Sequence, residues 1–257
     1  MTHPFDLTGQ VAIVTGSSRG IGKSIAAHLA EAGARVVISS RKQPACDAVA
    51  TEINAQHGAG RAIAIAASIS SKDALKALVD KTVEAFGRLD IVVCNAASNP
   101  YYGPMETITD EAFRKTLENN ILSNHWLINF ARPHLIAQGG GSVVIVSSNG
   151  ALRGSPVLGA YCISKAADVQ LARNLAVELG PKNIRVNCIL PGTVKTEFAR
   201  ALWEDPVTLE ETTRVTPLRR IGEPDDIGPC AVFLAADAGK FMTGETIVID
   251  GGWSIHE

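Results

Sequence analysis

The sequence predicts an α/β protein in which helices cover both faces of a doubly wound, seven-stranded parallel sheet. Three observations support this fold class. Short runs of β-branched residues alternate with longer helical stretches along the whole chain. The runs are apolar throughout, as expected for strands buried on both faces. A glycine-rich turn joins the first run to the first helix.

The first half of the chain supplies four strands and three helices. The run 62–66 fits a strand or a buried helix by periodicity, but its length, with Gly58 and Gly60 just before it, favours a strand. Pro44 is expected near the first position of the second helix. The third helix has Asp73 in its first turn and Gly87 just past its end. We expect strands at 11–15, 35–39, 62–66 and 90–94, and helices at 22–32, 44–57 and 71–86.

The second half continues the alternation and contains one irregular segment. A long helical zone is expected to be interrupted by Pro133. The segment 193–223 mixes apolar and charged residues with Pro206 and Pro217, and we interpret it as an excursion that closes over substrate as a lid. With no internal repeat or linker composition, residues 1–257 are expected to form one domain. We expect strands at 142–147, 184–189 and 246–250, and helices at 109–137, 160–179 and 224–236.

Composition excludes several classes of protein. Apolar residues make up 46% of the chain and charged residues 19%, which excludes disorder as a description of the whole. The net charge of −2 gives no general attraction to nucleic acid or to an anionic membrane. The five cysteines never form CxxC and the six histidines never form HxxxH, so we expect no metal site and reduced thiols. Without a recognisable signal peptide or membrane span, a cytoplasmic location is expected.

The turn after the first strand has phosphate-binding character. Its glycines are Gly16, Gly20 and Gly22, in the spacing GxxxGxG. Glycines at this place let backbone N–H groups approach a pyrophosphate, whose charge the helix N-terminus favours. The alternative is an ordinary glycine-rich turn, but its place on the first βα unit favours dinucleotide binding in a Rossmann-like domain.

Tyr161 and Lys165 stand four residues apart at the start of a predicted helix, so their side chains share one face. A free tyrosine has a pKa near 10. A neighbouring ammonium favours the phenolate and is expected to lower the pKa of Tyr161, which can then exchange a proton with a carbonyl or an alcohol. The alternative is a surface tyrosine beside a solvated lysine.

These motifs together resemble the short-chain dehydrogenase/reductase family. TGxxxGxG lies in the first turn, YxxxK on a later helix, and a serine 13 residues before the tyrosine. The resemblance covers essentially the whole chain and implies an oxidoreductase of the carbonyl reductase or alcohol dehydrogenase kind. It implies a catalytic set of Asn120, Ser148, Tyr161 and Lys165, with Asn119 and Ser147 as competing assignments for the first two. Asn120 is expected to hold water in a proton relay to the lysine, and the family suggests a homotetramer.

The cofactor is expected to be NADP(H) rather than NAD(H). No carboxylate follows the second strand, where one would bind ribose hydroxyls. Ser40 and Arg41 stand there instead, and Arg19 adds a second cation that suits a 2′-phosphate. The alternative for Arg41 and its neighbour Lys42 is a solvated pair of charges. The full expected cofactor set is Gly16, Ser18, Arg19, Gly20, Ile21, Gly22, Ser40, Arg41, Ser68, Asn95, Ala96, Tyr161, Lys165, Pro191, Gly192, Val194 and Thr196.

Two positions depart from the family pattern. Ala97 replaces a common glycine after the fourth strand, and Ser68 stands where an aspartate commonly faces the adenine. Both changes concern the adenosine end of the cofactor. The residues expected to carry the chemistry are unaffected by them.

The substrate is expected to be a small, neutral ketone or its secondary alcohol, because the expected pocket is aromatic and aliphatic. Phe198 and Trp203 have an alternative role, which is to pack the irregular segment onto the body of the protein. The expected pocket residues are Asn99, Tyr101, Tyr102, Leu152, Phe198 and Trp203, with Leu202 nearby. Two further functions stay open: a 3-oxoacyl carrier-protein reductase with Arg153, Arg214, Arg219 and Arg220 at the pocket mouth, and a non-catalytic nucleotide sensor.

Overall fold

A single seven-stranded sheet organises the computed structural model, which describes residues 3–255 apart from the side chain of Ala201. All pairs are parallel and the strand order is β3-β2-β1-β4-β5-β6-β7, so the predicted doubly wound parallel sheet is confirmed. The two residues at each end of the predicted domain 1–257 lie outside the described residues. The strands are β1 Val11–Thr15, β2 Arg35–Ser39, β3 Ala62–Ala64, β4 Ile91–Cys94, β5 Gly141–Val146, β6 Ile184–Pro191 and β7 Thr246–Ile249.

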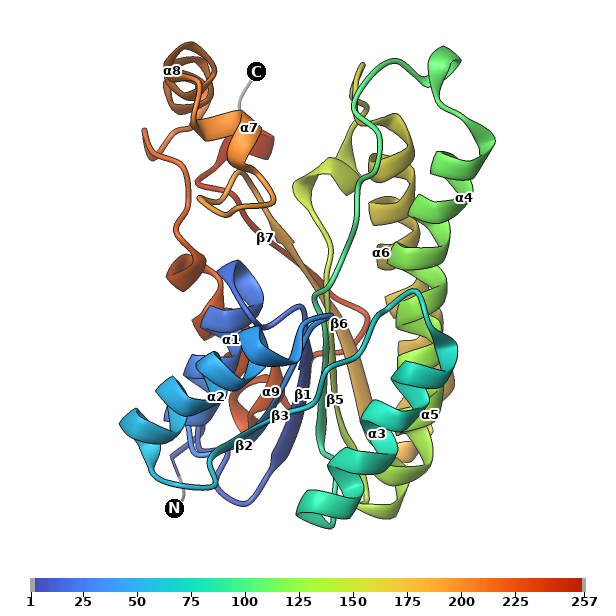
Figure 1. Ribbon diagram of the computed structural model, residues 1–257, viewed down its shortest axis with the longest axis vertical. Helices are drawn as coiled ribbons and strands as arrows, with labels where there is room; N and C mark the ends of the chain where they lie inside the picture. The colour runs from blue at the N-terminus through green and yellow to red at the C-terminus, as the bar shows by residue number, and fades with distance from the viewer. Residues whose placement is uncertain (1–2, 256–257) are drawn as a thin grey trace.

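Helices cover both faces of this sheet (Figure 1). One face packs against α1, α2 and α9 around a core that contains Ile25 and Val36. The other face packs against α3, α5 and α6 around a second core that contains Leu78 and Leu127. The helices are α1 Gly20–Glu31, α2 Gln43–His57, α3 Lys72–Phe86, α4 Asp110–Leu117, α5 Ser123–Ala137, α6 Gly159–Leu179, α7 Arg200–Trp203, α8 Pro206–Val215 and α9 Gly228–Ala235.

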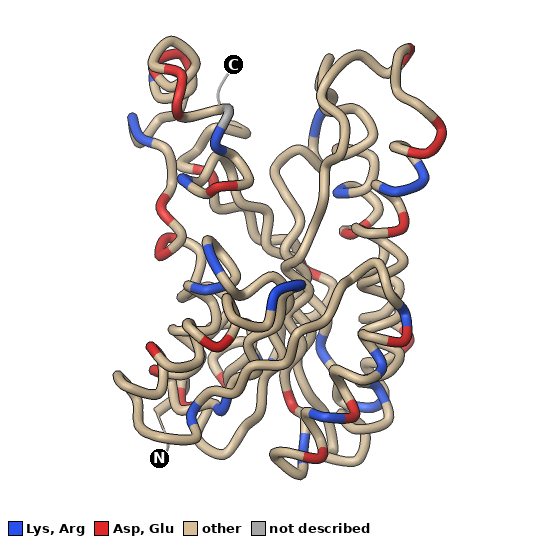
Figure 2. Tube along the Cα trace, viewed as in Figure 1, with Lys and Arg blue, Asp and Glu red and all other residues tan. Residues whose placement is uncertain are grey.

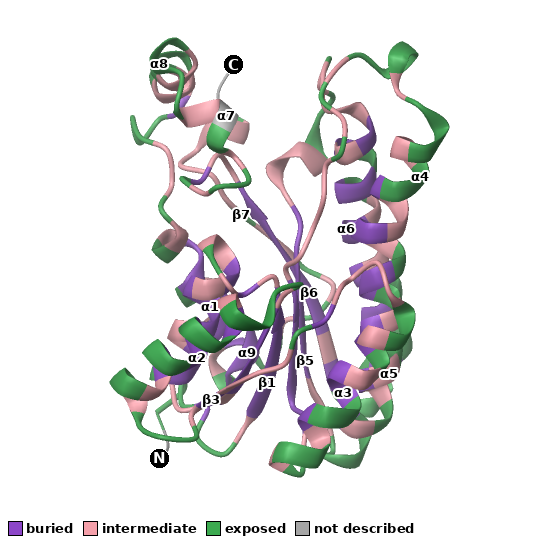
Figure 3. Ribbon diagram, viewed as in Figure 1, coloured by how far each residue is buried: buried purple, intermediate pink, exposed green. Residues whose placement is uncertain are grey.

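The five inner strands are largely buried and the edge strands β3 and β7 are mostly half-buried, whereas the segments beyond the carboxyl ends are largely exposed or half-buried (Figure 3). The chain order reverses between β1 and β4, and a doubly wound sheet binds ligands in the crevice at this point. Lys and Arg are interspersed with Asp and Glu over the fold (Figure 2), as the balanced composition predicts. Among the described residues, no helix is long and apolar enough to span a bilayer.

The long helical zone is interrupted at a different place from the one expected. Pro133 lies inside α5, which continues to Ala137. The break is a π-helical turn at Glu118–Leu122, between α4 and α5. Asn119 and Asn120 are buried in this turn and bond to the loop at Ser98, so side-chain hydrogen bonds hold the wider turn in place.

The segment 193–223 is more regular than expected, because it contains α7 and α8. Asp205 caps α8 by accepting a hydrogen bond from the Thr208 N–H at 3.0 Å, and Pro206 begins the helix. Both helices lie beyond the carboxyl ends of the strands (Figure 1). The last predicted helix also divides, into a 3₁₀ turn at Pro224–Asp226 followed by α9.

Candidate active site

The glycine-rich turn between β1 and α1 has the backbone that its sequence requires. Gly16 and Gly20 have φ angles of 68° and 56°, which disfavour any side chain. Gly22 has an ordinary φ, but a Cβ on it would lie 2.5 Å from the carbonyl oxygen of Gly16. Because these three positions lack side chains, the turn can adopt this backbone and α1 can begin directly after it. The same lack of side chains lets the backbone approach a ligand closely.

A cleft of about 590 Å³ opens over the carboxyl ends of the strands, beside this turn. It extends from the glycine turn and the end of β2 to α6 and the loop that begins at Thr196. Thirteen of the expected cofactor residues line it: Gly16, Ser18, Arg19, Gly20, Ile21, Gly22, Ser40, Arg41, Asn95, Ala96, Tyr161, Lys165 and Thr196.

Four expected cofactor residues do not line the cleft. Val194 is buried and bridges to Gly222, while Gly192 packs against Asp250. Pro191 is the last, buried residue of β6. Ser68 turns toward the start of α3, where its hydroxyl accepts a hydrogen bond from the N–H of Ser70. Ile69 and Ser70 line the cleft in its place.

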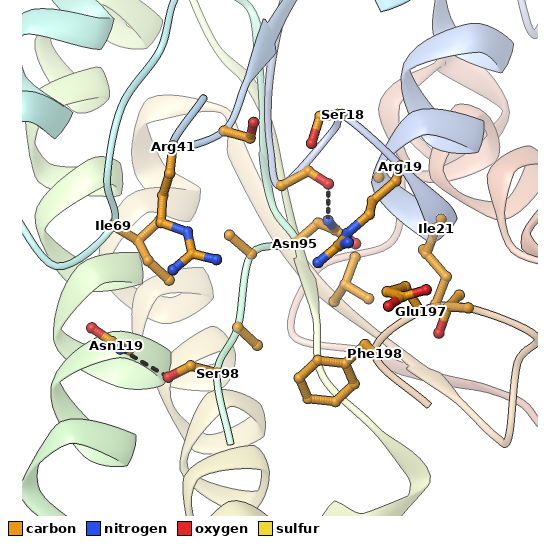
Figure 4. A pocket seen from close by; sticks show the side chains of 18 of the residues that line it. Ser18, Arg19, Ile21, Arg41, Ile69, Asn95, Ser98, Asn119, Glu197 and Phe198 are labelled. Atoms are coloured by element: carbon orange, nitrogen blue, oxygen red, sulfur yellow. Dashed lines mark hydrogen bonds between the residues drawn. The ribbon is translucent and has the colours of Figure 1, made fainter. Parts of the chain in front are cut away.

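One end of the cleft is basic. The side chains of Arg19 and Arg41 extend into it from opposite walls (Figure 4). Among the described residues that line the cleft, Glu197 is the only acidic one, and it belongs to the loop after β6. The cleft therefore attracts an anion where β1 and β2 end.

The other end of the cleft holds the phenol of Tyr161 and the ammonium of Lys165. Both residues belong to the first turns of α6, and the Lys165 nitrogen lies 5.7 Å from the centre of the Tyr161 ring. Burial raises the pKa of Tyr161 and outweighs the lowering by Lys165 and by a hydrogen bond with Ser148. The ammonium thus lowers the pKa of Tyr161 as expected, but burial has the larger effect.

The structure distinguishes the two candidate serines. The Ser147 hydroxyl donates to the carbonyl oxygen of Lys165 at 2.8 Å and is buried. The Ser148 hydroxyl accepts a hydrogen bond from the N–H of Gly150 at 3.1 Å and keeps its interaction with Tyr161. Ser147 lines the cleft and Ser148 does not, so the hydrogen-bonding effect on the pKa of Tyr161 is the feature that favours Ser148 as the serine beside the phenol.

Asn120 does not contact Lys165. Its side-chain amide donates to the carbonyl oxygen of Ser98 and to the Ser164 hydroxyl, both at 3.0 Å, and its Oδ1 accepts from the N–H of Ser98. Asn119 bonds to Ser70 and to the hydroxyl of Ser98. Both asparagines thus hold the loop after β4 against the π-helical turn.

Sequence reasoning missed two buried polar residues behind the cleft. The Lys165 nitrogen donates to Asp168 Oδ2 at 3.0 Å, and Asp168 Oδ1 accepts from the Asn124 side chain at 3.0 Å. The same amide of Asn124 donates to the carbonyl oxygen of Asn120 at 2.7 Å. The spacing of three residues from Lys165 could have indicated Asp168, since it places both on one face of α6.

The chain is similar in sequence to known proteins over almost its whole length. A family model described as Enoyl-(Acyl carrier protein) reductase matches residues 16–254. Dehydrogenase/reductase SDR family member 4 from Homo sapiens is 41% identical over 254 residues, which cover 98% of this chain and 90% of that protein. The chain belongs to the short-chain dehydrogenase/reductase family.

Solved structures of similar short-chain dehydrogenases include complexes with either nicotinamide cofactor. A 7α-hydroxysteroid dehydrogenase complexed with NADH and 7-oxo glycochenodeoxycholic acid has a TM-score of 0.93 and 35% identity, covering 98% of both chains. A gluconate 5-dehydrogenase from Burkholderia cenocepacia in complex with NADP and tartrate has a TM-score of 0.93 and 28% identity, covering 99% of this chain and 98% of its own. The chain is therefore an NAD(P)-dependent oxidoreductase, and these neighbours do not distinguish between the two cofactors.

The short-chain dehydrogenase brings only one of its six expected substrate residues to this cleft. Phe198 lines it, and its ring centre lies 5.9 Å from that of Tyr161. Tyr101 instead folds back onto its own loop and donates to the carbonyl oxygen of Pro104 at 3.0 Å. Trp203 donates to the carbonyl oxygen of Thr196 at 2.8 Å, which packs α7 against the loop after β6.

The remaining expected substrate residues do not line the cleft. Tyr102 is 63% exposed and Leu152 is 54% exposed, so neither side chain is enclosed in this structure. Asn99 is half-buried and does not line the cleft. No cluster of metal-ligating side chains occurs among residues 3–255.

Proposed function

We propose that this short-chain dehydrogenase transfers a hydride between NADP(H) and a small neutral ketone or secondary alcohol. The observation that carries the proposal is the arrangement of one cleft. A phenol and an ammonium stand at one end, and a glycine-rich turn with two arginines stands at the other. This arrangement suits an elongated anionic cofactor whose reactive end must meet a proton donor.

The residues present fit such a cofactor. Gly16, Gly20 and Gly22 leave the turn open for a pyrophosphate at the N-terminus of α1. Asn95 and Ala96 line the middle of the cleft, where they would contact a ribose. Lys165 would reach the second ribose, since it lines the cleft beside Tyr161.

The preference for NADP(H) rests on the end of β2. Ser40 and Arg41 line the cleft there, and Arg19 enters from the opposite wall (Figure 4). A guanidinium pairs well with a phosphate, and no carboxylate is present at the end of β2 to repel one. These residues therefore favour a 2′-phosphate over a free ribose hydroxyl.

In the proposed reaction, Tyr161 handles the proton. The bound nicotinamide supplies the hydride for reduction and accepts it in oxidation. Tyr161 donates its phenolic proton to the carbonyl oxygen as that oxygen gains charge, and takes a proton back from the alcohol in the reverse direction. Ser148 bonds to the same oxygen and stabilises the developing charge, while Lys165 stabilises the phenolate.

A small neutral substrate fits the groups near Tyr161 better than a carrier protein does. Phe198 supplies an aromatic wall. Two of the four cations that could have met an acidic carrier are engaged: Arg220 pairs with Asp226, and Arg153 stacks on Trp253. A carrier-bound substrate is therefore the less favoured alternative.

Steady-state kinetics with NADPH and NADH across a ketone panel test this function. We expect reduction of neutral ketones with a higher kcat/KM for NADPH, and loss of at least about 1,000-fold in Tyr161→Phe. Exposed Tyr102→Phe should retain parental kcat with NADPH and thus serves as the matched control. Undiminished activity in Tyr161→Phe would exclude the proton-donor role, and cofactor binding without turnover on any ketone would favour a nucleotide sensor.

We also propose a homotetramer in a reducing cytoplasm. Apolar side chains are exposed on α6, where Ile163 and Val177 are 46% and 81% accessible, and on α5 at Ile136. The five cysteines are free, and four of them are buried. Light scattering coupled to size exclusion should give four times the chain mass, and a monomer would contradict the assembly.

A further inference from the structure

The buried group that the proposed mechanism leaves unused is the carboxyl of Asp168. It is fully buried on α6, one turn after Lys165, which is itself only 2% exposed. Its Oδ2 accepts from the Lys165 ammonium and its Oδ1 accepts from the Asn124 amide, both at 3.0 Å. Burial raises the pKa of Asp168, while the Lys165 ammonium and the hydrogen bonds from Lys165 and Asn124 oppose that shift. Both oxygens accept hydrogen bonds, which favours the ionised carboxylate.

The ammonium of Lys165 has few other partners among the described residues. It donates to the carbonyl oxygen of Val146 at 3.1 Å, and its other recorded bond is to Asp168. A buried ammonium with only a carbonyl partner tends to lose its proton, because burial penalises the charged form. Burial acts to lower the pKa of Lys165, but Asp168 and then Tyr161 outweigh it, so the pKa is raised.

The other titratable groups around the pair are neutral thiols. Cys188 on β6 donates its thiol to the Asp168 carbonyl oxygen, and burial raises its pKa to about 12. Burial likewise raises the pKa of Cys94 on β4 and of Cys162 on α6. The charges of Lys165 and Asp168, with a smaller effect of Arg173 on Cys188, therefore set the electrostatics behind Tyr161.

We propose that Asp168 is a positioning residue that fixes the Lys165 ammonium and sets the pH at which the Tyr161–Lys165 pair loses its first proton. The inference rests on the proposed role of Tyr161 as proton donor. Asn124 completes the arrangement by tying the carboxylate to the carbonyl oxygen of Asn120 at 2.7 Å. A continuous hydrogen-bonded chain thus joins Asn120 to Lys165 through the side chains of Asn124 and Asp168.

As a consequence, the Tyr161–Lys165 pair keeps both of its protons into the alkaline pH range. A carboxylate next to the ammonium disfavours removal of a proton from either Lys165 or Tyr161. Because the two groups are coupled, the measured value belongs to the pair and not to one residue. Removing the charge of Asp168 should lower the first apparent pKa of the pair, whichever group loses its proton first.

The test titrates the ligand-free protein and needs no activity. The chain has three tyrosines, so Tyr101→Phe with Tyr102→Phe leaves Tyr161 alone. Labelling with ¹³Cζ-tyrosine and ¹³Cε-lysine then follows both groups by NMR, and the Lys165 signal is assigned by its loss in Lys165→Arg. In Asp168→Asn, we expect the first of the two signals to titrate at least about 1 pH unit lower.

Two control variants distinguish the loss of the Asp168 charge from a general loss of stability. Asn124→Ala removes the neighbouring hydrogen bonds but keeps the carboxylate, so the first titration should stay near the parental pH while thermal stability falls. Asp90→Asn removes a buried carboxylate at the opposite end of the sheet, where Asp90 pairs with Arg88, and should also leave the titration in place. If Asp168→Asn does not fold, Asp168→Ser, which is smaller and still accepts a hydrogen bond, takes its place.

An activity profile provides a second readout. The alkaline limb of ketone reduction should move down by the same amount in Asp168→Asn, because reduction requires the loaded pair. An unchanged first titration with only reduced stability would overturn the proposal, and so would an equal shift in Asn124→Ala. A protein that lacks reductase activity but shows the NMR shift would refute the proposed function and leave the role of Asp168 standing.

Discussion

The side-chain amide of Asn95, directly after β4, donates to the carbonyl oxygen of Thr15 at 2.8 Å at the end of β1. The Thr15 hydroxyl in turn accepts from the backbone N–H groups of Asn95 and Ala96. These bonds join the two strands at the point where the sheet order reverses. They also fix the space beneath the glycine turn, since Gly16 and Gly22 pack directly on the Asn95 amide.

Gly22→Ala is expected to disrupt this packing. Its Cβ would lie 2.5 Å from the Gly16 carbonyl oxygen and would displace the Asn95 amide. We expect a loss of about 2 kcal/mol in the free energy of unfolding and a KM for NADPH at least about tenfold higher. Urea denaturation and steady-state kinetics measure these effects. Gly180→Ala is the control, because a Cβ there meets nothing within 4 Å, and equal effects in both variants would contradict the explanation.

Ser148→Ala should impair chemistry more than folding. Removing a hydroxyl that faces the reacting oxygen is expected to lower kcat by about 100-fold. The alkaline limb of reduction should move up, since the hydrogen bond with Ser148 lowers the pKa of Tyr161. Ser147→Ala removes instead a buried bond to the Lys165 carbonyl and should cost about 1 kcal/mol of stability. The reverse pattern in pH profiles and thermal unfolding would reassign the catalytic serine.

Arg41→Ala should reduce discrimination between the cofactors. The loss of a charge-assisted bond to a 2′-phosphate is expected to raise the KM for NADPH by about 10- to 100-fold, with little change for NADH. Arg114→Ala removes an exposed arginine paired with Asp110 on α4 and is the control. A proportional rise for both cofactors in Arg41→Ala would show that Arg41 holds no 2′-phosphate.

Asp226→Asn should destabilise the protein only at pH values at which the Asp226 carboxyl is ionised in the folded protein. Arg220 forms two hydrogen bonds with this carboxylate, which also accepts from the N–H of Glu223 at 2.7 Å. The bond with Arg220 lowers the pKa of Asp226 to about 2. Because the folded pKa lies below the unfolded value, the stabilisation is complete above pH 4 and is lost as the pH falls toward 2.

The magnitude is modest because Arg220 is half-exposed and solvent screens the pair. We expect Asp226→Asn to cost about 1 kcal/mol at pH 7 and almost nothing near pH 2. Urea titrations of both proteins at several pH values measure the difference. A difference that stays constant down to pH 2 would show that the charge of Asp226 is not the stabilising feature.

Most residues on the cofactor side of the cleft could be predicted from motifs of residues close together in the chain. Gly16, Gly20 and Gly22 lie within one turn, and Tyr161 and Lys165 lie one helical turn apart, so chain geometry alone brings each set together. Such motifs could not predict the contact between Asn124 and Asp168. They lie on different helices, and their contact depends on how α5 packs beside α6.

The substrate side was harder to predict for the same reason. Tyr101 is an aromatic residue of the kind expected in a substrate pocket. Its hydroxyl instead forms hydrogen bonds with the Pro104 carbonyl oxygen and the Thr107 hydroxyl, close by in the chain. Trp203 likewise bonds to Thr196 inside the excursion. Of the six expected substrate residues, only Phe198 lines the cleft. Side chains on long loops take whichever partner the loop conformation offers, and composition does not specify it.

By itself, the sequence determined the parallel sheet, the glycine turn, the basic end of the cleft and the phenol–ammonium pair. Each depends on periodicity or on residues close together in the chain. Tertiary packing sets where the helical zone breaks and places a buried carboxylate behind Lys165. It also decided that burial outweighs the ammonium in setting the pKa of Tyr161. The physical reason is that desolvation and long-range hydrogen bonds arise from the packing of segments distant in sequence.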